Sequence, residues 1–216
     1  MKQMIESAFS FEMSKQNDDF SELFFYYVSG QDYLTNGKRL NDFLTTKNIV
    51  ENQTRFMECL ESVRIDDLSV FPKVKVSKEE VHKEKQNNVM IDMIKVPYKT
   101  RLSFFEGDSV STEEIHLDHL NKEHVEAIFL TELCRQSCMV CVNNFLGENS
   151  DYYIIEEFKK FKNIVKRNEP VQIQVLPVVG NKRRGRGICV FVVFQGDVVC
   201  LTGFYQMIYT KRRNDV

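Results

Sequence analysis

Residues 123–146, EHVEAIFLTELCRQSCMVCVNNFL, form the longest stretch with helical apolar periodicity, and the pattern after them is that of β-strands. This helix is apolar on nearly every face, which is typical of a buried helix. The strand patterns that follow are YYIIEEFKKFKNIV, strand-like at its start and ambiguous later, PVQIQVLPVVG, GICVFVVFQ and VVCLTGFYQMIYTKRR. A Gly196-Asp197 turn separates the last two. One long helix followed by long antiparallel strands predicts an α+β fold whose curled sheet wraps around the helix.

The first 75 residues carry shorter and less regular patterns. LTTKNIVENQTRFMECLESV, residues 44–63, keeps a rough helical spacing of apolar side chains and predicts a helix. FSFEMS and SELFFYYVSG are interpreted as strands, with turns near Gly30 and at Asn36-Gly37. Pro72 closes this region, so we expect an N-terminal extension over residues 1–75 and a main domain over residues 76–216.

Two strands are expected between this extension and the long helix. VSKEEVHKEKQNN, residues 76–88, is highly charged and is interpreted as a linking loop. VMIDMIKVPY and TRLSFF then have strand patterns, and Pro97 indicates an edge or a bend between them. EGDSVSTEEIHLDHLN is polar and predicts a loop that leads into the helix.

Composition narrows the class of protein. The chain has 216 residues, 43% of them hydrophobic, which suffices for a core, and its formal charge of −2 gives no general attraction to nucleic acid or to an anionic membrane. No apolar run reaches the length of a membrane span, and Glu6 and Glu12 interrupt the first residues, where a signal peptide would be apolar. We therefore expect a cytoplasmic protein whose six cysteines are reduced.

The long helix contains polar residues where a buried helix should be apolar. Glu132, Arg135 and Gln136 are spaced i, i+3 and i+4, so they share one face. A buried carboxylate and guanidinium are unfavourable unless they pair or serve a function. This cluster is therefore the candidate functional site.

Two segments of the chain resemble the A-factor biosynthesis hotdog family. VHKEKQNNVMIDM, residues 81–93, is similar to the family's opening unit of Val-His and a basic residue, followed by an apolar run that ends in Asp. EAIFLTELCRQS, residues 126–137, resembles the family's apolar stretch with Glu and then Arg-Gln three and four residues later. The likeness extends over about residues 75–210. The chain departs from the family in having one clear hotdog copy instead of two, and Glu126-Ala127 where a Pro often precedes the helix.

The resemblance implies a hotdog sheet around a central helix, paired with a second copy as a homodimer. It implies an acyltransferase that joins a β-ketoacyl chain, carried as a thioester on acyl carrier protein or CoA, to a hydroxyl acceptor such as dihydroxyacetone phosphate, as in γ-butyrolactone signal biosynthesis. Thioesterases and hydroxyacyl dehydratases are more distant hotdog proteins. No cofactor is implied.

The polar cluster offers residues for that chemistry. Burial is expected to raise the pKa of Glu132 towards the range of a general base. Arg135 is expected to bind a phosphate or a carbonyl oxygen, and Gln136 to donate to a developing oxyanion. The alternatives are a structural Glu132–Arg135 ion pair and a capping or sheet-contact role for Gln136.

All four histidines, His82, His116, His119 and His124, lie between residues 82 and 124. Dehydratases of the hotdog superfamily keep a catalytic histidine before the helix, so His124 is the candidate that would assist catalysis. His82 is a candidate for substrate binding through the Val-His unit. Histidines that gather in a polar loop are otherwise solvent-exposed, and this remains the alternative for each of them.

GNKRRGRG, residues 180–187, is the one dense basic run. It lies between two strand patterns and predicts a hairpin tip. Its basic side chains could dock an acidic acyl carrier protein or the phosphates of a cofactor, and otherwise form a solvated turn. Nucleic acid is disfavoured because no aromatic residues are interleaved with the run. These side chains are Lys182, Arg183, Arg184 and Arg186.

Metal binding is not expected. The spacing of Cys134, Cys138 and Cys141 is formally that of radical-SAM enzymes, but in a helix it places the thiols at i, i+4 and i+7 as a rigid stripe. We interpret the stripe as core. The His-rich loop also lacks the spacing of a zinc site.

Two classes of function therefore remain. The first is an acyl-thioester enzyme, either the acyltransferase or a thioesterase or dehydratase. The second is a non-catalytic hotdog dimer that binds an acyl ligand or a partner protein, in which Glu132 and Arg135 form a closed structural pair.

Overall fold

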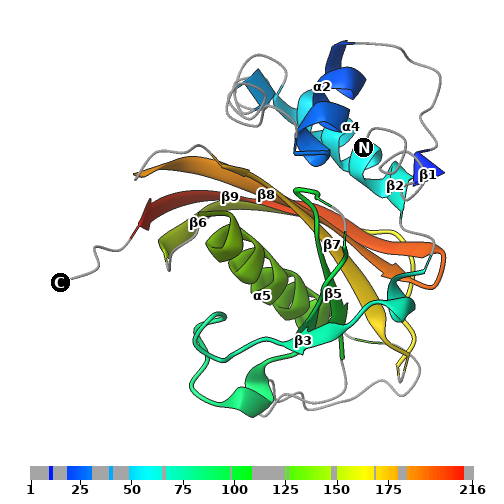
Figure 1. Cartoon of the computed structure of the whole chain (residues 1–216), viewed down its shortest axis with the longest axis vertical. Coiled ribbons are helices and arrows are strands. Elements are labelled where there is room, and N and C mark those ends of the chain that lie inside the picture. The colour runs from blue at the N-terminus through cyan, green and yellow to red at the C-terminus, as the bar shows by residue number, and fades with distance from the viewer. Residues whose placement is uncertain are drawn as a thin grey trace.

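The computed structural model describes residues 10–11, 19–30, 39–40, 49–64, 67–97, 99–108, 125, 127–146, 150–167, 169–179 and 184–211 (Figure 1). Its helices are α2 (Asp19–Val28), α4 (Ile49–Ser62) and α5 (Ala127–Leu146), with short 3-10 helices η1 (Leu68–Val70) and η2 (Gln86–Asn88). Its strands are β1 (Ser10–Phe11), β2 (Val63–Arg64), β3 (Lys73–Lys75), β4 (Ile91–Ile94), β5 (Ser103–Gly107), β6 (Ser150–Phe161), β7 (Val171–Val179), β8 (Arg184–Gln195) and β9 (Val198–Lys211). Among the described residues, no helix is both long and apolar enough to cross a membrane.

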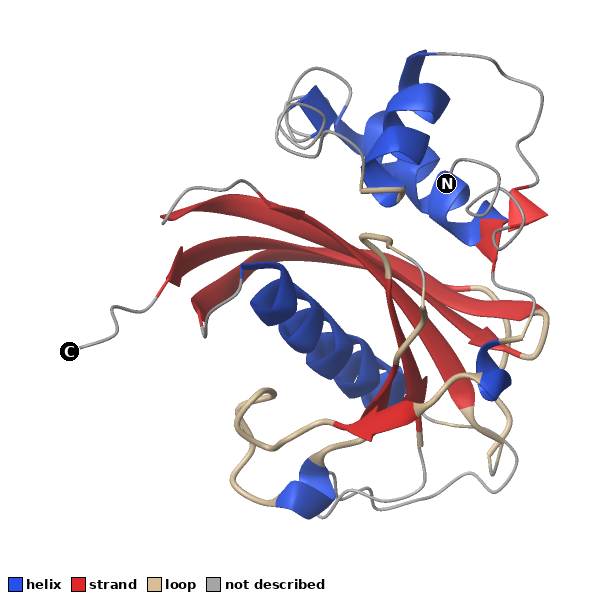
Figure 2. Ribbon diagram, viewed as in Figure 1, coloured by secondary structure: helices blue, strands red, loops and turns tan. Residues whose placement is uncertain are grey.

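Seven strands form one antiparallel sheet in the order β3-β4-β5-β7-β8-β9-β6. The sheet curls around α5, which runs along its concave side (Figure 2). β7, β8 and β9 follow each other as neighbours, whereas β6 lies beyond β9 at the far edge of the sheet. This is the α+β hotdog arrangement that the sequence predicts, with one long helix wrapped by a curled antiparallel sheet.

The core between α5 and the concave face of the sheet is almost wholly apolar. Leu133 and Cys134 on α5 are fully buried, as are Val175 on β7 and Phe191 on β8. Gly107 on β5 lies so close to the helix that a Cβ atom there would be 2.7 Å from Leu133 Cδ2. Glycine therefore allows the helix to approach the sheet at this point.

A second apolar core covers the convex face of the same sheet. α2 and α4 lie on that face, above β8 and β9 in Figure 1, and bury Phe24, Tyr27 and Phe56 against Val190 and Phe204. Strands buried on both faces read as continuous apolar runs. This explains the sequence GICVFVVFQ in β8, which has no polar alternation.

At one end of β7, a side chain supplies the hydrogen bond that a neighbouring strand would otherwise make. β5 pairs with β7 only as far as Ser103 opposite Val175, and beyond that pair no strand among the described residues lies next to the outer edge of β7. Pro177 lies there, where its missing N–H loses no ladder bond. Tyr27 of α2 donates a hydrogen bond from its hydroxyl to the Pro177 carbonyl at 2.5 Å.

The interpretation of SELFFYYVSG as a strand is wrong, because most of it lies in helix α2. Its aromatic residues favour strands, but Phe20, Leu23, Phe24, Tyr27 and Val28 are spaced as one helical face and are all buried. Packing against the sheet therefore outweighed the local preference.

Most other predicted elements are confirmed over the described residues. The helix expected over 44–63 is observed as α4, and the strands predicted around Pro97 are β4 and β5. The ambiguous segment after α5 is strand to Phe161, and the turns at Gly30 and Gly196 have positive φ values of 72° and 55°. Of FSFEMS, Ser10–Phe11 form β1; the turn expected at Asn36-Gly37 and most of the polar loop 106–121 lie outside the described residues.

Candidate functional site

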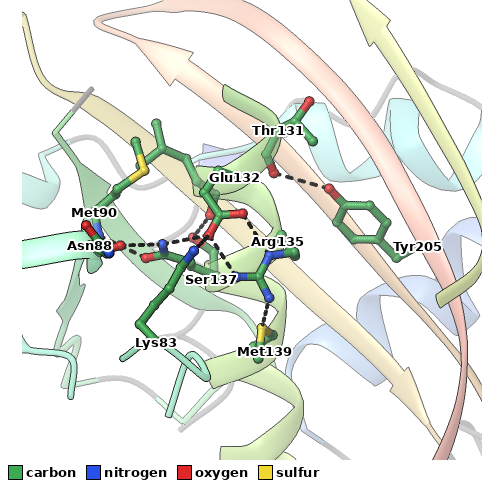
Figure 3. Close-up of polar contacts among 11 residues, drawn as sticks. Lys83, Asn88, Met90, Thr131, Glu132, Arg135, Ser137, Met139 and Tyr205 are labelled. Atoms are coloured by element: carbon green, nitrogen blue, oxygen red, sulfur yellow. Dashed lines mark hydrogen bonds and ion pairs between the residues drawn. The ribbon is translucent and has the colours of Figure 1, made fainter. Parts of the chain in front are cut away.

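The polar cluster on α5 assembles as the i, i+3, i+4 spacing predicts (Figure 3). Arg135 donates to both carboxylate oxygens of Glu132, from Nε at 2.8 Å and from Nη2 at 2.7 Å. Gln136 Nε2 donates to Glu132 Oε1 at 2.9 Å. The two-point contact fixes the guanidinium plane relative to the carboxylate.

The loop that precedes β4 closes the cluster from the other side. Lys83 Nζ lies 2.9 Å from Glu132 Oε1, and both side chains are mostly buried. Gln136 Nε2 also donates to the Asn88 carbonyl at 2.8 Å, and Gln136 Oε1 accepts from the Met90 N–H at 2.9 Å. The segments 81–93 and 126–137, which are far apart in the sequence, therefore meet in one site.

The expectation that burial raises the pKa of Glu132 is wrong. Burial alone would raise it, but hydrogen bonds from Arg135, Gln136 and Lys83 outweigh burial and lower the pKa to about 2. The carboxylate is therefore ionised at neutral pH and is held by two cations. A general base needs a pKa near the working pH, so Glu132 in this state is a weak one.

The hydrogen-bonding capacity of Gln136 is largely used. The residue is fully buried, both Nε2 hydrogens have acceptors, and its carbonyl oxygen accepts from a backbone N–H. Gln136 fastens the loop to the helix in the structure. Its direct role towards an oxyanion stays a prediction.

Arg135 is the member of the cluster that reaches towards solvent, with 30% of its side chain exposed. Its Nη1 lies 2.6 Å from the sulfur of Met139, one turn further along α5. Hydrogen bonding to Glu132 raises the pKa of Arg135, so the guanidinium stays charged. A charged, anchored and partly exposed guanidinium is suited to bind a carbonyl oxygen or a phosphate.

His82 is the one histidine of the four that lies within the described residues. It immediately precedes Lys83, and its ring stacks on Tyr152 of β6 with the centroids 5.7 Å apart. Its φ of 54° lies in the left-handed region, which is uncommon for a residue with a side chain. Its role in substrate binding stays a prediction, as does that of His124, which lies outside the described residues together with His116 and His119.

The structure describes only the second half of the basic run, residues 184–187. Arg184 and Arg186 lie exposed at the start of β8, opposite Thr210 and Ile208 of β9. Both lie beyond Val179 and Gly187, the last pair between β7 and β8, so they belong to the predicted tip of this hairpin. Lys182 and Arg183 lie outside the described residues. Docking of a carrier protein or of phosphates at these four residues stays a prediction.

The cysteine stripe is core, as predicted. Cys134, Cys138 and Cys141 are buried against the sheet beside Cys189 of β8. Burial raises the pKa of each of these thiols, so they are poor nucleophiles and poor metal ligands at neutral pH. No group of three or more metal-ligating side chains is placed to hold an ion within the described ranges.

Three side chains near the cluster were not singled out from the sequence. Lys83 completes the charge balance of Glu132, and the only sign of it was its place in the Val-His-basic unit. Tyr205 of β9 donates to the Thr131 carbonyl at 3.3 Å, one residue before Glu132 (Figure 3). Lys159 of β6 lies over the Tyr205 ring at 5.2 Å. Contacts of the last two depend on strand register, which sequence patterns do not reveal.

Two cavities adjoin this region. The first, of about 540 Å³, is polar and shares Met90 with the cluster. The second, of about 720 Å³, lies at the start of α5, where Leu130, Phe161, Ile164 and Val198 form part of its apolar lining. Glu132 lines neither of these two cavities.

No protein-family model matches the sequence, and no curated protein matches it. Among solved structures, a sigma28-regulated virulence protein from Campylobacter jejuni has a TM-score of 0.46 at 11% identity, over 61% of this chain and 92% of that chain. An uncharacterized protein from Pyrococcus horikoshii has a TM-score of 0.46 at 18% identity, over 65% and 96%. A phenylacetic acid degradation protein from Thermus thermophilus has a TM-score of 0.41 at 12% identity, over 56% and 93%. Likenesses at this level carry no statement about activity.

Proposed function

We propose that this protein processes acyl thioesters as an enzyme related to the A-factor biosynthesis hotdog family. The reaction is transfer of a β-ketoacyl group from acyl carrier protein or CoA to a hydroxyl acceptor. The observation that supports it is the meeting of the two resembling segments through Lys83–Glu132 and through Gln136 with Asn88 and Met90. Residues that resemble a family in sequence are thereby joined in a single charged site on the central helix.

The proposed roles combine the contacts of the described residues with the family resemblance. The acceptor hydroxyl attacks the thioester carbonyl carbon, the C–O bond forms, the C–S bond breaks, and the hydroxyl proton passes to the thiolate. Arg135 polarises the carbonyl, and Glu132 orients Arg135. Because Glu132 is a weak base, His124 is proposed to take the hydroxyl proton and to pass it to the departing thiolate, since imidazole side chains commonly act as both base and acid. Gln136 positions the loop, and His82 contacts the substrate.

The basic residues are proposed to bind the carrier of the acyl chain. Carrier proteins are acidic, and Arg184 and Arg186 expose two positive charges side by side on one strand. Lys182 and Arg183 precede them in the chain. Charge reversal, R184E/R186E, is expected to raise the KM for a carrier-protein substrate about tenfold and to leave kcat unchanged. An unchanged KM would remove these residues from the proposal.

A thiol-release assay tests the activity. Purified protein is mixed with β-ketoacyl carrier protein, with and without dihydroxyacetone phosphate, and free thiol is followed over time. Release that depends on the acceptor indicates a transferase, and release without the acceptor indicates a thioesterase. E132Q is expected to lower turnover about a hundredfold by releasing Arg135 from its position.

The matched control is E61Q. Glu61 of α4 also pairs with a lysine, Lys162, at 2.6 Å, but on another helix and away from the cluster. Circular dichroism shows whether each variant is folded. A folded E132Q protein with the turnover of the wild type would exclude Glu132 from catalysis.

A second candidate is a non-catalytic dimer that binds an acyl ligand or a partner protein. The closed ion cluster favours it, because Glu132 is balanced by Lys83 and Arg135 and lines neither described cavity. Binding of the acyl carrier protein without release of thiol, with or without an acceptor, would support this candidate over the enzyme.

A further inference from the structure

Lys159 of β6 is a buried cation that the proposed mechanism does not use. Only 10% of its side chain is exposed, although its partner Glu157, whose Oε2 lies 2.7 Å from Lys159 Nζ, is 58% exposed. Removing an ammonium group from water is unfavourable unless a partner or a ligand compensates for it. An exposed carboxylate stabilises such a cation weakly, because water competes for both charges. The burial of Lys159 therefore indicates a role beyond this ion pair.

The ammonium group of Lys159 faces the part of α5 that carries Arg135. In the register of β6 with β9, Lys159 lies opposite Gly203, on the concave face of the sheet. Its Nζ lies 5.2 Å from the centre of the Tyr205 ring. Burial raises the pKa of the Cys134 thiol, and the charge of Lys159 opposes this rise, so the ammonium group lies within electrostatic range of α5.

Tyr205 adjoins both Lys159 and Arg135. Its hydroxyl donates to the Thr131 carbonyl at 3.3 Å, and in a helix that carbonyl points towards the N–H of Arg135 (Figure 3). Burial raises the pKa of Tyr205, and the charge of Arg135 opposes this rise, as expected for a guanidinium near the phenol. The ammonium group lies over the ring of the same phenol. Both cations therefore border the space around one tyrosine side chain.

Glu157 is the partner of Lys159 that a ligand can replace. Its side chain is mostly exposed, so it can turn into solvent at little cost. A ligand that replaces it competes with a carboxylate tethered two residues away, which has a high effective concentration. A ligand carboxylate carries the same charge without the tether and would lose this competition. A phosphate monoester carries a charge of about −1.5 to −2 at pH 7 and three acceptor oxygens, so it binds the ammonium group more strongly.

A phosphate at Lys159 would place the rest of a small ligand towards Arg135. In the proposed reaction, Arg135 polarises the thioester carbonyl, and the acceptor hydroxyl must reach the carbon of that carbonyl. Because both cations border the same phenol, a short acceptor can hold its phosphate at Lys159 and its hydroxyl near Arg135. The two cations then have separate tasks, one towards each substrate.

We propose that Lys159 selects the acceptor by binding its phosphate monoester, with Glu157 as the counter-ion that the phosphate displaces. The inference rests on the proposed acyl transfer and adds the residue that recognises the acceptor. No bond of the phosphate forms or breaks, since the group serves only for binding and orientation.

Calorimetric titration of the full chain with dihydroxyacetone phosphate tests this site without any turnover. The wild type is expected to bind it, and not to bind dihydroxyacetone at the same concentrations. K159M keeps an aliphatic side chain over Tyr205 and removes the charge, so it is expected to raise the Kd about ten- to a hundredfold. E157Q is expected to lower the Kd, because the competing charge is gone. An unchanged Kd in K159M, or a raised one in E157Q, would overturn the proposal.

K160M is the matched control for K159M. Lys160 is the next residue of β6 and carries the same charge, but it is exposed and points to the other face of the sheet, opposite Thr202. Its Kd for dihydroxyacetone phosphate is expected to equal that of the wild type, and circular dichroism shows that each variant is folded. Titration with CoA distinguishes the source of the phosphate. If K159M weakens binding of CoA and not of dihydroxyacetone phosphate, the site holds the acyl carrier and the assignment to the acceptor is wrong.

Failure of this inference and failure of the proposed function give different results. Binding of dihydroxyacetone phosphate that depends on Lys159, without any release of thiol from the acyl carrier, would support the phosphate site and exclude the acyl transfer. Thiol release that depends on dihydroxyacetone phosphate, with the same KM for this acceptor in K159M as in the wild type, would support the acyl transfer and exclude the phosphate site.

Discussion

At the scale of single residues, Glu132 is better described as an anchor than as a base. It holds Arg135 at two points, accepts from Gln136, and pairs with Lys83 from a loop more than forty positions earlier. Its burial was inferred correctly from the helical pattern, but burial and hydrogen bonding act on the pKa in opposite directions. The sequence does not reveal which effect is larger, because it does not show that Arg135, Gln136 and Lys83 all reach the carboxylate, and Lys83 comes from a distant segment.

The low pKa of Glu132 makes stability depend on pH. Because its folded-state pKa of about 2 lies below the ordinary value of 4.5, the carboxylate stabilises the fold above pH 4.5, and this contribution is lost as the pH falls towards 2. At pH 7, E132Q is expected to be less stable by about 1–2 kcal/mol. Urea unfolding of both proteins from pH 7 to pH 3 measures the difference, which should shrink below pH 4.5. A constant difference would contradict the assigned pKa.

At the scale of elements, the sequence was most informative where one pattern persisted over many residues. α5 and strands β7–β9 were predicted because their apolar runs are long and end at clear turns such as Gly196. α2 was missed because Phe24, Phe25, Tyr26 and Tyr27 favour strands locally. The helix is favoured because it buries one apolar face against the sheet, and the sequence of this segment alone does not reveal that contact. The place of β6 beside β9 was not predictable either, since strand order is set by the tertiary fold.

The contact between α5 and β5 can be tested by a double-mutant cycle. G107A is expected to destabilise the protein by about 1–3 kcal/mol, because its new methyl group would be 2.7 Å from Leu133 Cδ2. L133A alone is expected to destabilise it by about 2–5 kcal/mol through a cavity. In the L133A background, G107A should be less harmful, because the clashing atom is gone. Urea unfolding gives the four free energies, and simple additivity would argue against the contact.

At the scale of the whole molecule, the two faces of one sheet each form part of a hydrophobic core. α5 fills its concave face, and α2 with α4 cover its convex face, so the central strands have no polar side. The ion pair of Glu61 on α4 with Lys162 after β6 adds a further link between the N-terminal layer and the sheet. Residues 49–62 therefore pack on the same sheet as the long helix does, on its other face.

The shared sheet predicts a single unfolding transition. F56A removes a fully buried ring between α4 and the sheet, and is expected to destabilise the protein by about 3–5 kcal/mol. Hydrogen exchange should show amides of α4 and α5 losing protection at the same denaturant concentration. V70A is the control, because Val70 is 67% exposed. Two separate transitions would show that the layers fold independently.

The order of these layers along the chain has a consequence for synthesis. α2 and α4 leave the ribosome before β8 and β9, the strands that cover their apolar faces. Until then Phe24 and Phe56 can contact each other but not the sheet, and a nascent chain would leave them partly exposed for more than a hundred residues of translation. We expect such a chain to bind chaperones that recognise exposed aromatic side chains, and we expect slower translation to increase its aggregation.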